Sequence, residues 1–422
     1  MKGRGRHSGH TAGRDQSGAI LPFIAVGLLA IIGVAGMAID SSHAFVNVTR
    51  VQNAVDAAAL SAAKTLHLFG KDTALATAHG NETFTDHLEG ELGDDLEIAF
   101  TYSDTLSPFA AGGADPNYVR ATVAALDIDI WFARVLPGVD DTFSIGATAV
   151  SGPLPLGGGQ VCDIAPLLVC APDTTDTDAS DGTLYGMTIG DDAPVSCLKQ
   201  NSHDGGNGNG NGNGNGGNAE PTTCAEDAGD PTLESGNFYL SRVNCPGGKC
   251  VRDALAGAYE GCADLSGSIE TEPGNTVGPT RQGLNTRFNL YQGGGVSPTE
   301  YPPDLVTGSM LYPAYKQAYA AEAWDNTIGE EQRRVMAVPI ADCAGLQNGQ
   351  SSAPLLGLGC YFLTQPVPAP GGQGGGGNNS YILGQLIDRC EASGRPGNTN
   401  GPANENGPYK IVLLDDPDSE GS

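Results

Sequence analysis

Positively charged residues are scarce in this chain. Its 422 residues include 21 Lys and Arg against 49 Asp and Glu, a formal net charge of -28, and four of the basic residues fall in the first 14 positions. An acidic protein of this kind repels nucleic acid and anionic lipid. The composition therefore gives no reason to expect a nucleic-acid partner, and a well-solvated surface is its simplest explanation.

Histidine is also scarce. Six of the seven histidines lie before residue 90, and the last, His203, borders a Gly-Asn tract. Ser-His-Asp and Cys-His catalytic sites, and most zinc sites, require imidazole in the folded domain, and the sequence has no Gly-x-Ser-x-Gly motif. We therefore predict a non-enzymatic protein without a metal or cofactor. An exported enzyme that uses only Asp and Glu is an alternative, although no spacing of carboxylates marks it.

Cysteine is absent from the first 161 residues. No Cys-x-x-Cys pair occurs, which disfavours zinc and redox sites, whereas cysteines confined to the region after an apolar segment favour disulfides formed after export. The spacing does not specify which cysteines pair. The predicted disulfide cysteines are Cys162, Cys170, Cys197, Cys224, Cys245, Cys250, Cys262, Cys343, Cys360 and Cys390.

Residues 19–39 contain no charged side chain. A helix of this length spans ~31 Å, close to the hydrocarbon thickness of a bilayer. Basic residues precede the segment and Asp40 follows it, so the positive-inside rule places residues 1–18 in the cytoplasm and the chain beyond residue 39 on the other side. We predict a single transmembrane helix over 19–39 in an inner membrane.

A cleaved signal peptide is the alternative explanation of the same segment. Gly36 and Ala38 are small enough to precede a cleavage site, and the mature chain would then begin near Ile39. The apolar core of a signal peptide is usually only ~7–15 residues long, shorter than the run found here. The length therefore favours a retained anchor.

Helical spacing continues past the apolar segment. Phe45, Val48, Gln52, Val55 and Ala59 recur every three or four residues, which predicts a helix that leaves the membrane and ends near residue 68. A weaker helix is predicted over 72–91, capped by Asp72. Alternating apolar residues then predict strands over 96–102, 118–130 and 142–150, with a short helical turn over 131–136. Residues 40–151 should thus form a long helix packed on a small antiparallel sheet.

The segment from Ser17 to Ala63 has a Gly-Ala opening, an apolar stretch, Ala-Ile-Asp, and then Gln-Asn-Ala-Val-Asp-Ala-Ala-Ala-Leu. With this pattern it resembles the N-terminal TadE/TadG-like module of TadG-like proteins, which belong to the tight-adherence (Flp) pilus assembly system of bacteria. The resemblance implies a bacterial envelope protein that supports pilus biogenesis, adhesion or biofilm formation, with other pilin-like or pilus-assembly proteins as partners. The family-motif residues are Asp40, Gln52, Asn53, Ala54, Asp56, Ala57, Ala58, Ala59 and Leu60.

The resemblance also suggests a processing site. Pilin-type precursors are cut after a glycine that precedes the apolar helix, and here Gly18 and Ala19 occupy those positions. Such precursors usually have Glu at the fifth position after the cut, whereas this chain has Phe23. Cleavage between Gly18 and Ala19 is thus an open alternative.

From residue 152 the composition changes to Gly, Pro, Asn, Asp and Cys. Residues 152–393 are predicted to form a loop-rich, mostly β, disulfide-containing domain, interrupted by Gly/Asn-rich loops at 204–219 and 371–379. Residues 272–288 are predicted to be an ordered, turn-rich loop, in which Arg281 and Arg287 pair with nearby carboxylates or face a partner. Residues 394–422 should be a flexible acidic tail, apart from a possible strand at 409–414.

These expectations combine into one hypothesis. The chain is predicted to be an α+β protein with one N-terminal transmembrane helix, an extracytoplasmic pilin-like part and a disulfide-bonded domain. Its predicted role is non-enzymatic assembly or anchoring of an Flp-type pilus at the inner membrane. The alternative from another class is a secreted or surface adhesin released by signal cleavage.

Overall fold

A computed structural model describes residues 20–88, 96–132, 140–155, 160–162, 164–200, 237–242, 247–258, 262–264, 267–273, 276–344, 346, 351–369, 380–391 and 407–416. Several predictions concern residues outside these ranges. They are the cytoplasmic N-terminus (1–18), the possible cleavage between Gly18 and Ala19, and the two Gly/Asn-rich loops. The chain divides into two compact units: residues 1–62, 76–151 and 413–422 form the first, and residues 63–75 and 152–412 form the second.

The first unit is built around α1 (Ile20–Leu68), a continuous helix of 49 residues. Its first part is apolar and exposed, as Phe23, Leu29 and Ile31 illustrate, whereas its later part is buried against protein. The helix is long and apolar enough to cross a membrane by length and composition. The predicted helix over residues 20–68 is confirmed.

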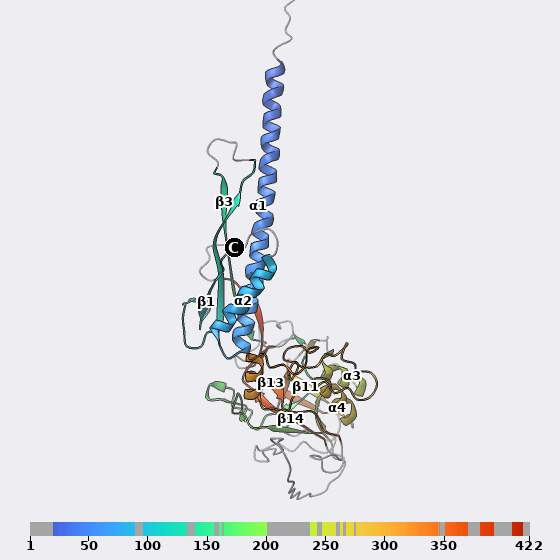
Figure 1. Cartoon of the computed structure of the whole chain (residues 1–422). Helices are drawn as coiled ribbons and strands as arrows, with labels where there is room; N and C mark the ends of the chain where they lie inside the picture. The colour runs from blue at the N-terminus through green and yellow to red at the C-terminus, as the bar shows by residue number, and fades with distance from the viewer. Residues whose placement is uncertain are drawn as a thin grey trace, which may run out of the picture. The chain divides into compact units, whose positions relative to one another are not determined.

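A three-stranded antiparallel meander packs beside α1 (Figure 1). Its strands are β1 (Ala99–Ser103), β2 (Tyr118–Asp129) and β3 (Thr142–Pro155). Ala121 and Ala149 are paired across β2 and β3, and both are buried. The inward residues of the two strands meet Val55, Ala58 and Ala59 of α1 in one apolar core. The three predicted strands are therefore present.

The second helix of this region, α2 (Thr73–Leu88), begins where the sequence predicts it. Asp72 Oδ1 accepts hydrogen bonds from the backbone N–H groups of Ala74, at 2.9 Å, and Leu75, at 3.0 Å. A carboxylate in this position satisfies N–H groups that have no partner within the helix. The predicted helical turn at 131–136 is wrong at its start, because Trp131 and Phe132 form a bend; residues 133–136 are outside the described ranges.

The second unit is centred on a seven-stranded sheet with strand order β5-β12-β13-β11-β9, in which β14 pairs with both β13 and β8. Its long central strand, β13 (Ser352–Leu363), pairs along its length with β12 (Val335–Ala341). The other strands are β5 (Val169–Cys170), β8 (Ser196–Gln200), β9 (Asn237–Ser241), β11 (Ser268–Pro273) and β14 (Ser380–Ile387).

Short strands, turns and helices complete the second unit. Two small antiparallel pairs and one short 3₁₀ turn connect its strands. They are β4 (Gln160–Cys162) with β10 (Cys262–Asp264), β6 (Thr183–Leu184) with β7 (Met187–Thr188), and the turn Ala179–Asp181. The helices are α3 (Gly248–Asp253), which continues into a π-helical turn (Ala254–Ala258), α4 (Val277–Thr286) and α5 (Tyr312–Ala320).

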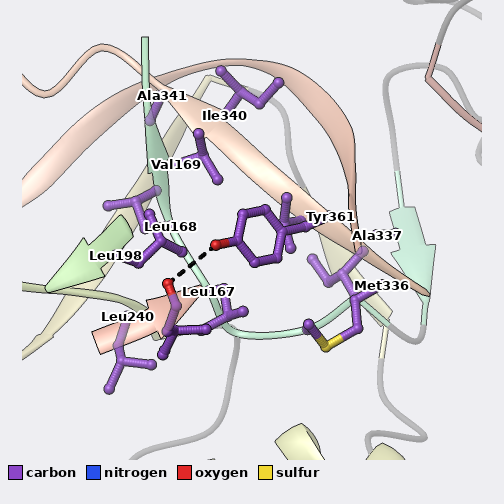
Figure 2. Close-up of a cluster of buried hydrophobic side chains, with 14 of the residues drawn as sticks. Leu167, Leu168, Val169, Leu198, Leu240, Met336, Ala337, Ile340, Ala341 and Tyr361 are labelled. Carbon is purple, nitrogen blue, oxygen red and sulfur yellow. Dashed lines mark hydrogen bonds between the residues drawn. The ribbon is translucent and has the colours of Figure 1, made fainter. Parts of the chain in front are cut away.

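An apolar core underlies the seven-stranded sheet (Figure 2). Leu167, Leu240 and Val338 are fully buried there, together with Tyr361. The Tyr361 hydroxyl donates to the carbonyl of Ile382 at 3.2 Å, so the buried phenol is not left without a partner. Tyr361 also fits against Gly384, where any added Cβ would collide with its ring.

The prediction of a loop over 272–288 is wrong. Most of that segment is α4, and its Gly and Pro residues have packing roles. Pro279 lies in the first helical turn, where its missing N–H breaks no helical hydrogen bond. A Cβ on Gly283 would come within 2.3 Å of the Arg252 carbonyl oxygen. Gly283 therefore permits close contact between α4 and the α3 segment.

The strand predicted at 409–414, within the otherwise flexible tail, is present as β16 (Pro408–Leu414). The strand pairs in parallel with β15 (Cys390–Glu391) and joins the sheet in the order β1-β2-β3-β16-β15. Tyr409 and Ile411 are buried, which supplies an apolar reason for the strand to order.

Disulfides occur in the second unit. Cys170 pairs with Cys343, and Cys360 with Cys390. The first joins β5 to the residues after β12, and the second ties β13 to β15. Cys197 and Cys250 are also disulfide-bonded. Cys162 and Cys262 lie opposite each other in the β4–β10 pair, and Cys224 and Cys245 fall outside the described residues.

The small buried face of α1 yields a stability prediction. Ala58 is fully buried between α1 and the sheet, so Ala58→Leu should destabilise the protein by about 1–3 kcal/mol through overpacking. Asn53→Leu, which introduces the same side chain at an exposed position of the same helix, should have little effect. Thermal unfolding of the detergent-solubilised chain measures both; equal midpoints would show that the face tolerates larger residues.

Candidate functional site

The family-motif residues of α1 divide into a polar set and a packing set. Ala54, Ala58 and Ala59 are fully buried in the core of the first unit. Ala57 and Leu60 are half-buried, and Asn53 is exposed. Because alanine side chains are short, they allow the sheet backbone to approach the helix closely. This part of the motif is explained by packing.

Gln52 and Asp56 form the polar part of the motif in the middle of the helix. Gln52 Nε2 donates to Asp56 Oδ1 at 2.8 Å and to the Thr148 carbonyl of β3 at 3.1 Å. The pair borders a hollow of 490 Å³, lined also by residues 122–124, 146–150 and 413–416. The motif thus brings a carboxylate and an amide to a concave surface of the first unit.

Asp40 is the motif residue nearest the apolar segment, and it contacts the loop after β2. Its Oδ2 accepts a hydrogen bond from the backbone N–H of Phe132 at 2.9 Å, and its Oδ1 accepts one from Trp131 at 3.1 Å. The Trp131 ring also packs on His43, with the ring centroids 4.3 Å apart. Sequence reasoning identified Asp40 but not these partners, because they are 91 and 92 residues away in the chain.

The second unit contains a buried cation, Arg334, at the start of the sheet core. All five guanidinium N–H groups donate to backbone carbonyls, at 2.8 to 3.1 Å, and the acceptors belong to Val306, Gly308, Leu363 and Thr364. The rings of Phe288, Tyr315 and Phe362 lie within 5.2 Å of its central carbon. The side chain therefore fastens the 306–308 loop to the end of β13.

Asp304 is the buried anion beside Arg334. Its carboxylate accepts hydrogen bonds from the hydroxyls of Tyr315, at 2.7 Å, and Tyr319, at 3.0 Å, and from the backbone N–H groups of Val306 and Arg334. Burial raises the pKa of Asp304, although these hydrogen bonds act in the opposite direction. Burial and the nearby Asp304 charge raise the pKa of Tyr315 well above its usual range.

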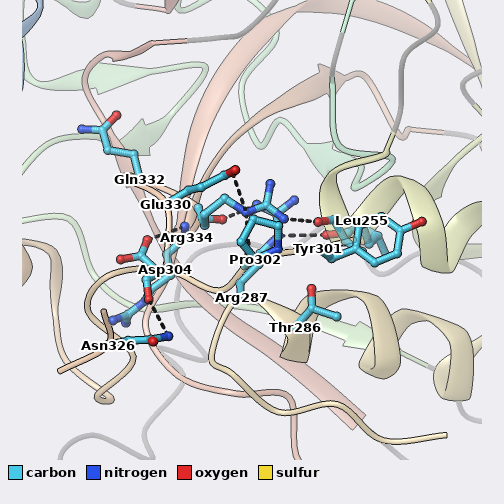
Figure 3. Close-up of polar contacts among 12 residues, drawn as sticks. Leu255, Thr286, Arg287, Tyr301, Pro302, Asp304, Asn326, Glu330, Gln332 and Arg334 are labelled. Atoms are coloured by element: carbon cyan, nitrogen blue, oxygen red, sulfur yellow. Dashed lines mark hydrogen bonds and ion pairs between the residues drawn. The ribbon is translucent and has the colours of Figure 1, made fainter. Parts of the chain in front are cut away.

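Two further arginines extend the network (Figure 3). Arg287 donates to the Leu255 carbonyl at 2.8 Å and to the Arg333 carbonyl, and Arg333 donates to the Pro302 carbonyl at 3.0 Å. Burial lowers the pKa of both guanidinium groups. The expectation that Arg287 pairs with carboxylates is wrong, since its side chain donates to carbonyl oxygens. Arg281 likewise donates to the Val367 carbonyl.

A polar cavity of 330 Å³ adjoins this network within the second unit. Lys64 and Glu331 form an ion pair across it at 3.0 Å, and Glu391 also lines it. Burial raises the pKa of Glu391. The cavity offers charges of both signs but no nucleophile beside a histidine, and among the described residues no group of three His, Cys, Asp or Glu could hold a metal ion.

These features define an α+β protein. It has an N-terminal helix suited to membrane anchoring and a disulfide-bonded C-terminal unit. More specifically, residues 18–65 match the Tad family model, a TadE/G-like Flp pilus-assembly domain. The chain therefore carries a pilus-assembly domain that coincides with most of α1. No curated protein and no solved structure matches the chain.

Sequence reasoning missed Asp304, Tyr315 and Arg334. The signal available was weak: Arg333 and Arg334 directly precede the apolar run of β12, and the two tyrosines recur at helical spacing in α5. Neither pattern reveals that Asp304, 30 residues before Arg334 and 11 before Tyr315, contacts both. A buried ion network depends on contacts between distant segments, which one sequence does not specify.

The network predicts a large penalty for removing its cation. Arg334→Met should destabilise the second unit by about 3–5 kcal/mol, because the four carbonyls that accept from its guanidinium would stay buried without a donor, at about 1–3 kcal/mol each before relaxation. Arg281→Met, which removes a partly exposed arginine with one long carbonyl bond, should cost much less. Denaturant unfolding under non-reducing conditions compares the two variants, and similar losses would contradict the assigned role of Arg334.

Proposed function

We propose that this protein is a single-pass inner-membrane protein that assembles or anchors an Flp-type pilus without enzymatic activity. The observation that carries the proposal is the coincidence of the family match at 18–65 with one helix that is exposed and apolar first and buried in protein afterwards. The N-terminus lies in the cytoplasm, and the two units lie on the periplasmic side, in accord with the charge asymmetry around the apolar run.

The mechanism is structural. The apolar part of α1 holds the chain in the bilayer, where it can pack beside the helices of pilin-like partners, and Gly27 and Gly33 leave room for such contacts. The first unit then presents the Gln52–Asp56 hollow, and the disulfide-bonded unit presents a rigid surface outside the membrane. Adhesion and biofilm formation would follow from the pilus, not from chemistry in this chain.

Release by signal cleavage is the competing proposal, and the course of α1 argues against it. Cleavage near Ile39 would cut the helix next to Asp40, whose carboxylate holds the loop after β2. Such a cut would also remove Gly36, against which Phe132 packs. Anchor and core belong to one uninterrupted element, which is the arrangement expected of a retained membrane protein.

Retention in the membrane can be tested with matched arginine substitutions. The full chain should resist alkaline extraction, and its intact mass should include residues 19–39. Leu29→Arg should lower the membrane-bound fraction, because an arginine at the centre of a span costs about 2.5–3.5 kcal/mol. Thr49→Arg, on the exposed side of the same helix beyond the apolar run, should not. A soluble mature chain that starts near Ile39 would support the released adhesin.

The pilus role can be tested genetically. An in-frame deletion should abolish surface fibres in electron micrographs and reduce surface attachment, and complementation with the full chain should restore both. Complementation with Leu29→Arg should fail, whereas Thr49→Arg should succeed at the same protein level. Unchanged fibres in the deletion strain would refute the assembly role and leave α1 as an export anchor for the two units.

A further inference from the structure

The loop that follows β2 exposes two large aromatic side chains. Trp131 and Phe132 are each 49% exposed, although both are apolar enough to belong in a core. They follow shortly after the end of β2, and the β2 and β3 strands lie along α1 (Figure 1). Adjacent aromatic side chains that are exposed in this way are typical of a surface that contacts a membrane or another protein.

Asp40 fixes the position of these residues relative to the apolar run of α1. Its carboxylate accepts hydrogen bonds from the backbone N–H groups of both Trp131 and Phe132, and it is the first charged residue after that run. A tilted ring contact between Trp131 and His43, with centroids 4.3 Å apart, adds a second contact. The aromatic pair is therefore held at the level where α1 changes from apolar to polar.

Phe132 reaches further along the helix, into the apolar run itself. A Cβ on Gly36 would lie 2.8 Å from the Phe132 Cβ, so glycine is what allows this contact. Gly36 precedes Asp40 by four residues, a displacement of ~6 Å along the helix axis. If residues 20–39 fill the hydrocarbon layer, Phe132 lies at its outer edge and Trp131 lies among the headgroups.

We propose that Trp131 and Phe132, which follow shortly after β2, form a second membrane contact at the outer interface of the bilayer that α1 crosses. Tryptophan favours this interface because its ring is apolar and its N–H remains hydrated. This inference rests on the proposed retention of α1 in the membrane. The exposed carboxylates of Asp127, Asp129 and Asp140 near this pair favour zwitterionic over anionic headgroups.

The contact would have a mechanical consequence. A protein held by one helix can rotate about that helix, whereas a second contact on a hairpin fixes the face that the sheet presents. The backbone hydrogen bonds from Trp131 and Phe132 to Asp40 make the hairpin and the helix one rigid attachment. The first unit would then show the Gln52–Asp56 hollow to its partners in a constant orientation relative to the membrane.

The chain has only two tryptophans, which permits a direct test. Trp324→Phe leaves Trp131 as the single emitter, and Trp131→Phe leaves Trp324, which is 48% exposed in the second unit. Each full-length variant is placed in phosphatidylcholine nanodiscs with or without bromine on the upper acyl chain. Trp131 emission should fall roughly two-fold in the brominated discs, as expected of an interfacial ring. Trp324 has no part in this contact, so its emission should be equal in both.

Asp40→Ala provides the positioning control. It removes the acceptor of both loop N–H groups and should reduce the quenching of Trp131, whereas Asp72→Ala, which removes an acceptor of two N–H groups at α2, should not. Stable incorporation into nanodiscs reports the α1 anchor separately. Incorporated protein whose Trp131 is quenched no more than Trp324 would overturn the hairpin contact while leaving the anchor intact. Trp131 shielded from acrylamide yet unquenched by bromine would also overturn it, in favour of a protein partner.

Discussion

The helix α1 must fit two surroundings, a bilayer along its first part and a β-sheet along its later part. The packing of the rest of the first unit depends on this division. The first part of α1 is apolar and exposed, as a bilayer requires, while its later part is lined with alanine and buried against a sheet. The hydrophobic effect drives both, but the sheet adds a demand for close approach that lipid does not make. Ala58 and Ala59 meet that demand, because a larger residue would hold the sheet away from the helix.

The second unit is stabilised in a different way. Its sheet packs on its own apolar core, and specific cross-links stabilise the segments around that sheet. The disulfides Cys170–Cys343 and Cys360–Cys390 fasten the sheet covalently. Arg334 and Asp304 fasten the loops beside it, through carbonyl and hydroxyl groups that burial would otherwise leave unsatisfied.

The functional argument follows from the same division. The family match covers residues 18–65, so it bears on the anchor and the packing face of α1 and not on the second unit. Within the described residues, the charged cavity beside Arg333 has no arrangement that suggests catalysis. We therefore propose a structural role at the membrane. Three features support it: the continuous helix α1, the hairpin held by Asp40, and the Gln52–Asp56 pair on a concave surface.

The sequence by itself determined whatever depends on local periodicity or composition. The apolar run, the helix through residue 68, the Asp72 cap and the three strands after it could all be predicted, because each has a repeating or neighbouring signal. Only the tertiary structure decided the rest. In the sequence, Gly283 and Pro279 suggest a loop, but in the structure they lie in a helix that packs against the α3 segment. Arg334 reads as a surface cation, whereas in the structure carbonyl groups surround it. The position of Trp131 becomes clear only from its contact with Asp40. Each of these depends on contacts between residues far apart in the chain, which a local pattern does not encode.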